Sequence, residues 1–308
     1  MDYHTGMTTK LQMKNTHLEH PEDSILDGNL QVLDWFVTPG QLSVKIDGSP
    51  AIVWGIDPAN GQFFVGTKAV FNKVKIRIGH SHEEIDQFYT DKVADILHAC
   101  FDHLPRVKGI YQGDWIGNGG SDEYTPNTIT YKFPEIVIQK IIIAPHTIYT
   151  AESDLRDAVA HPMKGYLPST HSCLYVKPLA YILHDQESFV DVEEVCDFAR
   201  QMAMTCNFVS GKQLTELKKA INACIREQRE IEDDAFDCDS NLIRLWKLVK
   251  SIKEDCLFLC RYCDGPDAYI ENDQIDAEGY VMTNDFGMFK LVNREVFSHA
   301  NFTIQKNW

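Results

Sequence analysis

Residues 42–48 of the chain read LSVKIDG. This short apolar run is typical of a strand that ends in Lys45, and Asp47 and Gly48 then supply a carboxylate and a turn residue. A lysine at a strand end beside a carboxylate is a candidate nucleophile. The same pattern also suits an exposed strand end followed by a turn, so the rest of the chain has to decide between the two interpretations.

Further strand-like runs lie on both sides of a helical region. The apolar runs are 42–46, 51–54, 63–65, 109–111, 136–143, 279–282 and 288–292. Turn residues at 57–61 and 284–287 separate neighbouring runs and favour antiparallel pairing. Between 83 and 104 apolar residues recur at helical spacing, which predicts one helix over a sheet face. The sequence therefore predicts an α+β fold with antiparallel sheets flanked by helices.

Residues 187–263 have the periodicity of three consecutive helices. Asp191 and Glu194 have the spacing of a capping box at the start of the first helix. The apolar stripes of the other two are Leu214, Leu217, Ile221 and Ile225, and then Leu242, Leu245, Trp246, Val249 and Ile252. We predict an N-terminal leader, 1–35, that packs on the core, a main domain of 36–186 and 264–308, and a helical insertion of 187–263.

The composition limits the classes of protein to consider. With 308 residues and 44% hydrophobic content, the chain can bury a sizeable core, which argues against disorder. No apolar run is long enough for a membrane span, the first residues are polar, and nine cysteines suit reduced thiols, so we expect a cytoplasmic protein without a membrane partner. A net charge of −16 means that any nucleic-acid surface must be local.

Three later segments supply partners for Lys45. Residues 109–114 read GIYQGD, 278–281 read EGYV and 289–292 read FKLV. With LSVKIDG, these segments make the chain resemble the covalent nucleotidyltransferase superfamily of ATP-dependent DNA ligases, RNA ligases and messenger-RNA capping enzymes. The resemblance spans about 42–297 without the helical insertion. It implies a ligase-type nucleotidyltransferase domain, here with no C-terminal OB-fold.

The resemblance also implies roles for individual residues. Lys45 would accept the nucleotide as a phosphoramidate, and Lys290 would contact the α-phosphate and help to keep the Lys45 amine neutral. Asp114 would hold the ribose hydroxyls, and Glu278 would position a catalytic Mg²⁺ or Mn²⁺. The other nucleotide-binding residues that the resemblance implies are Asp47, Gly48 and Lys68.

The activity implied is ATP-dependent and passes AMP from Lys45 to a 5'-phosphate end. The EGYV segment at 278–281 is similar to the RNA-ligase version of this element, which favours RNA or a nicked duplex as the acceptor. The chain also resembles phage-encoded ligase-like proteins with a Gly-Thr-Lys segment, here residues 66–68, which would place it in a host cytoplasm. The helical insertion could bind a protein partner.

Four departures from the family pattern keep other functions open. Pro50 replaces a common arginine, Asp114 replaces a glutamate, Val292 replaces a second lysine, and only 293–308 follow the last element. The nucleotide could therefore pass to a protein or small molecule. Alternatively, the chain could be a catalytically inactive nucleotide-binding or structural protein.

A basic stretch near the candidate site could contact nucleic acid. If residues 73–77 form a strand, Lys73, Lys75 and Arg77 share one face and could follow a phosphate backbone. A solvated strand face explains the same residues.

Cysteines 256, 260 and 263 have the C-x3-C-x2-C spacing of the iron–sulfur motif of radical S-adenosylmethionine enzymes. Zinc held with Cys238 as a fourth ligand is another interpretation. The cysteines also continue a helical pattern, which favours buried structural thiols instead.

Overall fold

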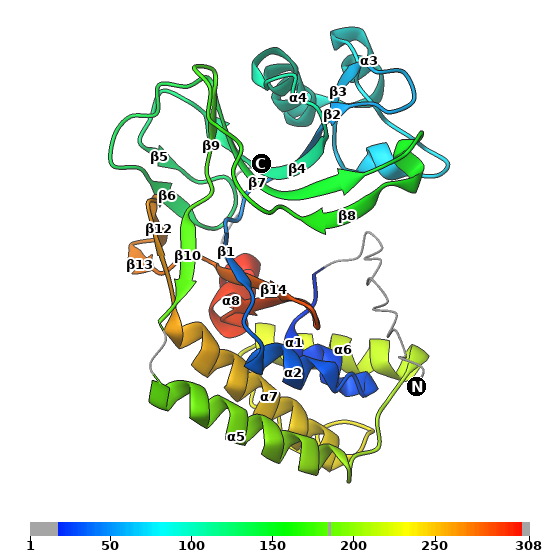
Figure 1. The fold of residues 1–308 in the computed structure, drawn as a ribbon, viewed down its shortest axis with the longest axis vertical. Coiled ribbons are helices and arrows are strands. Elements are labelled where there is room, and N and C mark those ends of the chain that lie inside the picture. The colour runs from blue at the N-terminus through cyan, green and yellow to red at the C-terminus, as the bar shows by residue number, and fades with distance from the viewer. Residues whose placement is uncertain (1–17, 184–185, 304–308) are drawn as a thin grey trace, which may run out of the picture.

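The computed structural model describes residues 18–183 and 186–303, and these residues form an α+β protein whose sheets are largely antiparallel. Figure 1 shows two lobes. The upper lobe holds the largest sheet, and the lower lobe is mainly helical. The chain crosses between them at several places, which brings segments that are distant in sequence together at the boundary.

The upper lobe is built on a six-stranded sheet. Its members are β2 (Ala51–Ile56), β3 (Phe63–Gly66), β4 (Ile110–Asn118), β7 (Ile141–Thr150), β8 (Val159–Pro162) and β9 (Cys173–Tyr175). The order is β3-β2-β4-β7-β8, all antiparallel, while β9 pairs with β7 in parallel. Trp54 and Ile143 are fully buried between this sheet and its helices. The strands predicted at 51–54 and 63–65 are confirmed, and β4 contains most of the run predicted at 109–111. The strand predicted over 136–143 was wrong in its bounds, because β7 begins only at Ile141 and the exposed Ile136 and Ile138 lie in the preceding loop.

The helix predicted over 83–104 is two helices, α3 (His82–Phe88) and α4 (Asp91–His103). Asp91 has a φ of 55°, outside the range of a right-handed helix, so the chain turns there. Ile85 of α3 and Leu97 of α4 are both fully buried, and the apolar spacing therefore continues across the break. The prediction of a single helix was wrong, because the spacing of apolar residues does not reveal that one residue has a different backbone conformation.

The basic stretch after β3 is not a strand. A short 3-10 helix, η2 (Lys68–Phe71), follows β3, and residues 72–79 form a loop in which only Gly79 pairs with a strand, at Val65. Lys73, Lys75 and Arg77 are exposed on this loop. The conditional prediction that they share a strand face is therefore wrong.

A small sheet lies beside the boundary between the lobes. It contains β5 (Glu123–Tyr124), β6 (Thr130–Lys132), β12 (Asp267–Ile270) and β13 (Asp273–Ile275), in the order β13-β12-β6-β5. The register pairs Ala268 with Tyr131, both nearly fully buried. This sheet joins the chain on either side of the three long helices.

The lower lobe packs helices against a three-stranded sheet. The helices are α1 (Pro21–Ser24), α2 (Gln31–Val37), α5 (Gln186–Ala203), α6 (Gly211–Arg226), α7 (Ser240–Leu259) and α8 (Arg294–Thr303), with short 3-10 turns at Ile25–Asp27 here and Leu155–Asp157 in the upper lobe. The sheet is β1 (Gln41–Lys45), β14 (Gly279–Asn284) and β15 (Gly287–Val292), in the order β1-β14-β15. A separate antiparallel pair contains β10 (Leu179–Ile182) and β11 (Cys260–Cys263). The three long helices lie between these two strands in the sequence.

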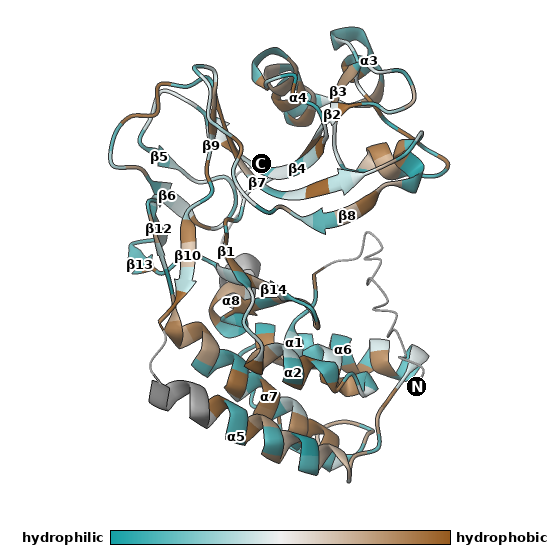
Figure 2. Cartoon of the chain, in the orientation of Figure 1, coloured by the Kyte–Doolittle hydropathy of each residue, from teal (hydrophilic) through white to brown (hydrophobic). Residues whose placement is uncertain are grey.

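The three predicted helices of 187–263 share one core with the N-terminal helices and the three-stranded sheet. Trp35 of α2, Trp246 of α7 and Leu291 of β15 belong to the same buried cluster. Figure 2 shows apolar stripes along α5 and α7 alternating with polar faces. Asp191 and Glu194 lie inside α5, which begins at Gln186, so they do not cap its start. In the predicted leader, 1–17 lie outside the described residues, whereas 18–35 pack on the lower lobe.

A buried ionic network fixes the N-terminal helix to the lower lobe. Lys253 donates to Glu22 at 2.7 Å, and both side chains are fully buried. Arg294 donates to Asp23 at 2.7 Å and to Glu22 at 3.1 Å, and Trp246 donates to Asp23 at 3.0 Å. Segments from both ends of the chain are thus tied to α7, directly beneath the three-stranded sheet.

Candidate functional site

The three-stranded sheet has one apolar and one polar face. Tyr280 and Leu291 face the helices, as alternation along a strand requires. On the other face the register aligns Ser43, Val281 and Lys290 across the three strands, and Lys45 lies two residues further along β1. Lys45 and Lys290 therefore share the face opposite the helices, two strands apart.

Lys45 forms an ion pair with Glu278, the residue immediately before β14. Burial alone would lower the pKa of Lys45, but the carboxylates of Glu278, Asp47 and Asp114 outweigh burial and raise it. Burial raises the pKa of Glu278, while Lys45 opposes that change. Lys45 is therefore held as an ammonium.

Lys290 is the second cation of the site. Burial, and then the positive charge of Lys45, lower the pKa of Lys290. The backbone of Glu19 accepts a hydrogen bond of 3.1 Å from the Lys290 amide, so the N-terminal segment lies beside β15 as a single bridge. The Glu19 carboxylate forms an ion pair with Lys218 of α6. A lysine with a lowered pKa beside Lys45 is suited to binding an anion.

His20 is a neighbour of this pair that the sequence did not reveal. Its Nδ1 is buried without a hydrogen-bond partner among the described residues. Burial and the charges of Arg294 and Lys290, followed by Lys253 and Lys45, hold the pKa of His20 far below its usual range. Its position in a polar leader gave no signal of this, because the contact depends on the isolated bridge between Glu19 and Phe289.

The link between β1 and β2 carries the chain from the lower lobe to the upper lobe past Asp114. The Ser49 amide donates to the Trp115 carbonyl at 3.0 Å, and the Trp115 amide donates to the Pro50 carbonyl at 3.1 Å. A Cβ on Gly48 would lie 2.5 Å from the Trp115 carbonyl and 2.9 Å from Cβ of Asp114. Only glycine lets the link approach β4 this closely.

Asp47 is held by the small sheet. Asn127 Nδ2 donates to Asp47 Oδ2 at 2.6 Å, and the Asp47 amide donates to the Tyr131 hydroxyl at 2.7 Å. The side-chain oxygen of Asn127, Oδ1, is buried with no hydrogen-bond partner in the described chain. The sequence did not single out Asn127 or Tyr131, because β6 is only three residues long.

His146 lies across from Asp114 on the neighbouring strand. Asp114 of β4 pairs with Ala144 of β7, and His146 Nε2 lies 3.7 Å from Asp114 Oδ1. Both side chains retain access to solvent. His146 follows the apolar run 141–143, so the sequence places it at the end of a strand. Its position opposite Asp114 could not be predicted without the register of β4 and β7.

The structure brings together Lys45, Asp47, Asp114, Glu278 and Lys290, with Gly48 beside them. Lys68 is exposed at the start of η2 and forms no ion pair within 18–183 or 186–303, so no contact in those ranges ties it to the other site residues. Lys73, Lys75 and Arg77 also carry no ion pair within those ranges.

The side chains present suit a divalent cation of the hard type. Mg²⁺ is usually held by one or two carboxylates together with water and substrate phosphates, and Glu278, Asp47 and Asp114 are the carboxylates near Lys45. Across the described chain, no three or more His, Cys, Asp or Glu side chains are gathered as ready metal ligands. A cation at this site would therefore depend on the phosphates of a nucleotide as well as on Glu278.

The cysteine cluster does not form in the folded chain. Cys260 donates its thiol to the Cys256 carbonyl at 3.2 Å, and burial raises the pKa of Cys260 to about 12. Cys263 is exposed at the end of β11, and Cys238 lies before the start of α7, at the other end of this helix. The iron–sulfur and four-cysteine zinc interpretations were wrong.

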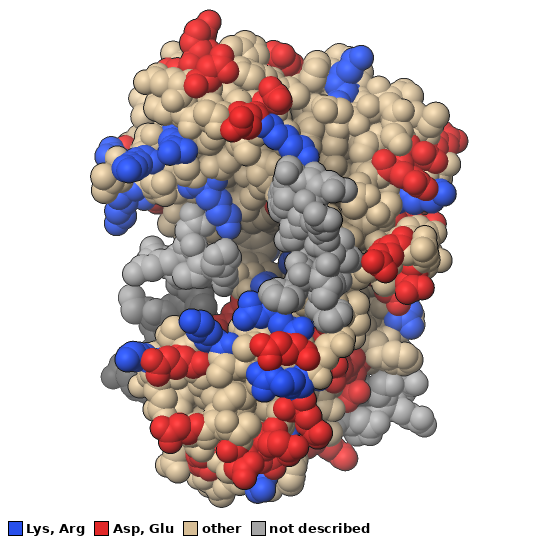
Figure 3. Space-filling view, turned by 180° about the vertical axis from the view of Figure 1, so that it is seen from behind, with Lys and Arg blue, Asp and Glu red and all other residues tan. Residues whose placement is uncertain are grey.

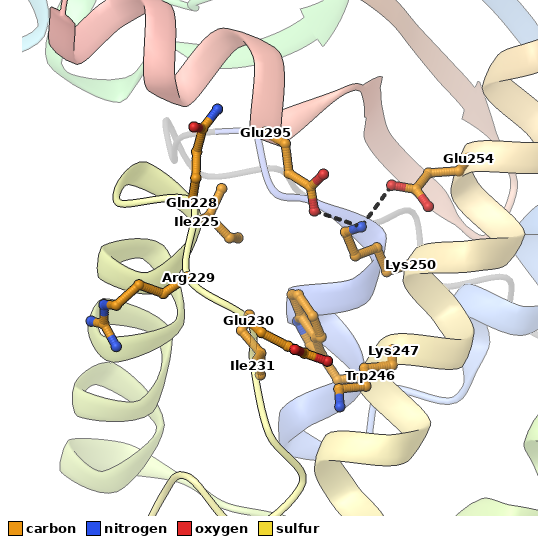
Figure 4. A pocket seen from close by; sticks show the side chains of 10 residues that line it. All are labelled: Ile225, Gln228, Arg229, Glu230, Ile231, Trp246, Lys247, Lys250, Glu254 and Glu295. Atoms are coloured by element: carbon orange, nitrogen blue, oxygen red, sulfur yellow. Dashed lines mark ion pairs between the residues drawn. The ribbon is translucent and has the colours of Figure 1, made fainter.

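The surface around the site is mixed in charge. Seen from behind, Figure 3 shows a hollow between the lobes with Lys and Arg side chains on both rims, while acidic side chains gather on the lower lobe. A separate pocket lies between α6, α7 and α8 (Figure 4), where Lys250 pairs with Glu254 at 2.8 Å and with Glu295 at 3.0 Å. Two carboxylates there surround the single Lys250 ammonium, so that pocket offers no comparable anion site.

The described helices include none that is long and apolar enough to cross a membrane. A family model described as "Family of unknown function (DUF6267)" matches residues 15–241 and 237–306. No curated protein and no solved structure matches the chain.

Proposed function

The chain belongs to the Family of unknown function (DUF6267), and from that premise we propose that it is an ATP-dependent, ligase-like nucleotidyltransferase that accepts AMP on Lys45. One observation carries the proposal. Lys45, Glu278 and Lys290 come from three separate chain segments and meet on the polar face of one sheet. The resemblance of the four sequence segments to ligases supports the same activity and a ligase-type fold.

In the proposed reaction, the Lys45 amine attacks the α-phosphorus of ATP, a P–N bond forms, and the P–O bond to pyrophosphate breaks. The ammonium must first lose a proton. Glu278 is the largest of the charges that raise the pKa of Lys45, so transfer of this carboxylate to a divalent cation would lower that pKa. Magnesium or manganese would supply charge neutralisation of the triphosphate.

The remaining residues would orient the nucleotide. Lys290 and His20, which influence each other electrostatically, would face a phosphate, and Asp114, one of the carboxylates that raise the pKa of Lys45, would face the ribose. Asp47 is oriented by Asn127 and would hold the acceptor lysine and its surroundings in place. The proposed acceptor of AMP is a 5'-phosphate end of RNA or of a nicked duplex.

Covalent labelling tests this proposal. Purified protein is incubated with α-labelled ATP or GTP and Mg²⁺ or Mn²⁺, denatured, and examined for an acid-labile label that pyrophosphate removes as the triphosphate. We expect label on the wild type and on Lys212→Ala, a control at an exposed lysine, and none on Lys45→Ala or Lys45→Arg. If no nucleotide labels the wild type with either metal, the protein is a nucleotide-binding or structural protein instead.

A second acceptor class is motivated by the charge of the chain. A net charge of −16 opposes broad contact with nucleic acid, which suits transfer of AMP to a protein or small molecule. Labelled protein distinguishes the two. Loss of label to a 5'-phosphorylated RNA or nicked duplex, weakening as salt increases, supports the nucleic-acid acceptor, whereas indifference to every such end supports the alternative.

A further inference from the structure

The segment that follows β3 concentrates positive charge on a chain that is acidic as a whole. Lys68, Lys73, Lys75 and Arg77 all lie there, whereas residues 58–82 contain no Asp or Glu. The four side chains are exposed, and none of them forms an ion pair with another described residue. We call residues 68–77 the basic loop. Its charge is available to an anion from outside the chain.

The backbone of the basic loop is held by contacts of its own. Tyr89 joins the two ends, because the Thr67 amide donates to its hydroxyl at 3.2 Å and this hydroxyl donates to the Arg77 carbonyl at 2.9 Å. The Arg77 amide also donates to the Ala69 carbonyl at 3.3 Å, and Val70 is fully buried. The loop is therefore ordered before any partner binds, which lowers the entropy lost on binding.

The register of the six-stranded sheet places the basic loop at the end of the sheet that carries Asp114. Gly66, the last residue of β3, pairs with Val53 of β2, and Ala51 of β2 pairs with Asp114 of β4. Because β3 runs antiparallel to β2, the chain leaves β3 toward the level of Ala51. Neighbouring strands are about 4.8 Å apart, so the basic loop begins roughly 10 Å from the backbone of β4 at Asp114.

We propose that the basic loop binds the phosphodiester backbone of the nucleic acid that accepts AMP. Neutralisation of phosphates by Lys and Arg supplies most of the sequence-independent affinity of proteins for nucleic acid. The loop offers such cations in an ordered segment beside the proposed site, although the net charge of the chain is −16. The inference rests on the proposed function for the role of the bound strand, and it favours nucleic acid over a protein or small molecule as the acceptor.

The apolar side chains of the loop argue against the surface of an anionic membrane as the partner. Val74, between Lys73 and Lys75, is 92% exposed, whereas Phe71 and Ile76 are partly covered. Segments that lie on membranes bury an apolar face with large residues such as Trp, Phe and Leu. One exposed valine is too small for that role, so we assign the loop to the phosphates of a nucleic acid rather than to lipid headgroups.

Equilibrium binding without ATP tests the inference. The fluorescence anisotropy of a labelled 5'-phosphorylated RNA and of a labelled nicked duplex is measured between about 50 and 200 mM salt. The loop variant removes the three outer cations of the basic loop with Lys73→Ala, Lys75→Ala and Arg77→Ala. The control variant removes the same charge from exposed lysines elsewhere with Lys92→Ala, Lys108→Ala and Lys212→Ala. Thermal unfolding followed by circular dichroism shows whether both are folded, and Lys75→Glu alone replaces the loop variant if it is not.

We expect the loop variant to bind both probes at least about tenfold more weakly at the lowest salt. The slope of log affinity against log salt should become shallower by about 2 for the RNA and about 3 for the duplex, since three phosphate contacts are lost. The control variant should keep the wild-type slope. Equal losses in the two variants would overturn the inference, because the net charge of the chain would then determine the affinity. So would a wild type that binds neither probe, or that binds only phosphatidylserine vesicles.

Failure of this inference and failure of the proposed function give different results. Label on Lys45 without binding that depends on the loop would leave nucleotide transfer in place and remove only the docking surface. Binding that depends on the loop without any label on Lys45 would keep the loop as a nucleic-acid site and remove nucleotide transfer.

Discussion

At the scale of single residues, the polar face of the three-stranded sheet carries charge that opposes folding. Burying the Lys290 ammonium near Lys45 works against folding, since burial and the like charge both lower its pKa. A residue kept for stability would not show this pattern. The cost is understandable if a polyanion binds there and offsets both charges.

Lys290→Met therefore separates stability from function. We expect lysyl-AMP formation to decrease about 10²- to 10³-fold, as when a single charge-stabilising group is removed, with Tm unchanged or higher than that of the wild type. A lowered pKa makes the Lys290 charge unfavourable below that pKa and relieves the effect as pH increases. The Tm difference should therefore shrink at alkaline pH.

Lys132→Met is the control, because Lys132 forms an exposed ion pair with Glu123 on the small sheet. Single-turnover labelling and thermal scans at several pH values provide both measurements. A large loss of Tm in Lys290→Met would contradict this account and assign the residue a structural role.

At the scale of elements, the link from β1 to β2 holds the two lobes in register at the site. The hydrogen bonds that join residues 49 and 50 to Trp115 fix its path, and Gly48 fits against β4 only because it lacks a side chain. Lys45 is the last residue of β1, directly before this short link, and Asp114 lies on β4, the strand that the link contacts. Its path therefore determines their separation.

Gly48→Ala should move the link away from β4. The added Cβ would meet the Trp115 carbonyl at 2.5 Å, a backbone atom that cannot rotate away. We expect the free energy of unfolding to decrease by about 1–3 kcal/mol and labelling at saturating ATP to decrease well beyond the folded fraction lost. Urea denaturation and labelling of the same preparation measure the two effects.

Gly61→Ala is a matched comparison in the turn before β3. A Cβ there meets nothing within 4 Å, although its φ of 73° disfavours alanine. It should lose about 1 kcal/mol of stability and keep its labelling rate. If the two variants lose labelling equally, the link has no special role in the site.

The sequence predicted the individual elements better than their junctions. Lys45 at the end of β1, and Lys290 within β15, follow from alternation of apolar residues over short strands. The break at Asp91 and the loop at 72–79 did not follow, because they depend on local backbone conformation and tertiary pairing. His146 reaches the site through strand register, and His20 and Asn127 reach it through the packing of distant segments, neither of which a single sequence encodes visibly.

At the scale of the whole molecule, a buried ionic network joins α1 to α7 and α8. Glu22 and Lys253 have no solvent exposure, and one Glu22 oxygen already lacks a hydrogen-bond partner in the described chain. Removing one member leaves an uncompensated buried charge, which costs more than the net contribution of the intact pair.

Lys253→Met should therefore lower the free energy of unfolding by about 3–5 kcal/mol. Combining it with Glu22→Gln should recover part of the loss. Lys250→Met, one turn earlier on α7, removes ion pairs to the more exposed Glu254 and Glu295 and should cost less than about 1 kcal/mol. Equal effects of Lys253→Met and Lys250→Met in urea denaturation would contradict the importance of the buried network.

The pairing of β1 with β14 also determines when the site can exist during synthesis. Residues 41–45 find their sheet partners only at 279–283, and Lys290 enters one strand later. Because a nascent chain emerges N-terminal end first, Lys45 leaves the ribosome long before Glu278 and Lys290 are translated. A ribosome that stalls before residue 278 therefore releases a fragment without the Lys45–Glu278–Lys290 arrangement, so a chain can assemble this arrangement only after residue 290 has been translated.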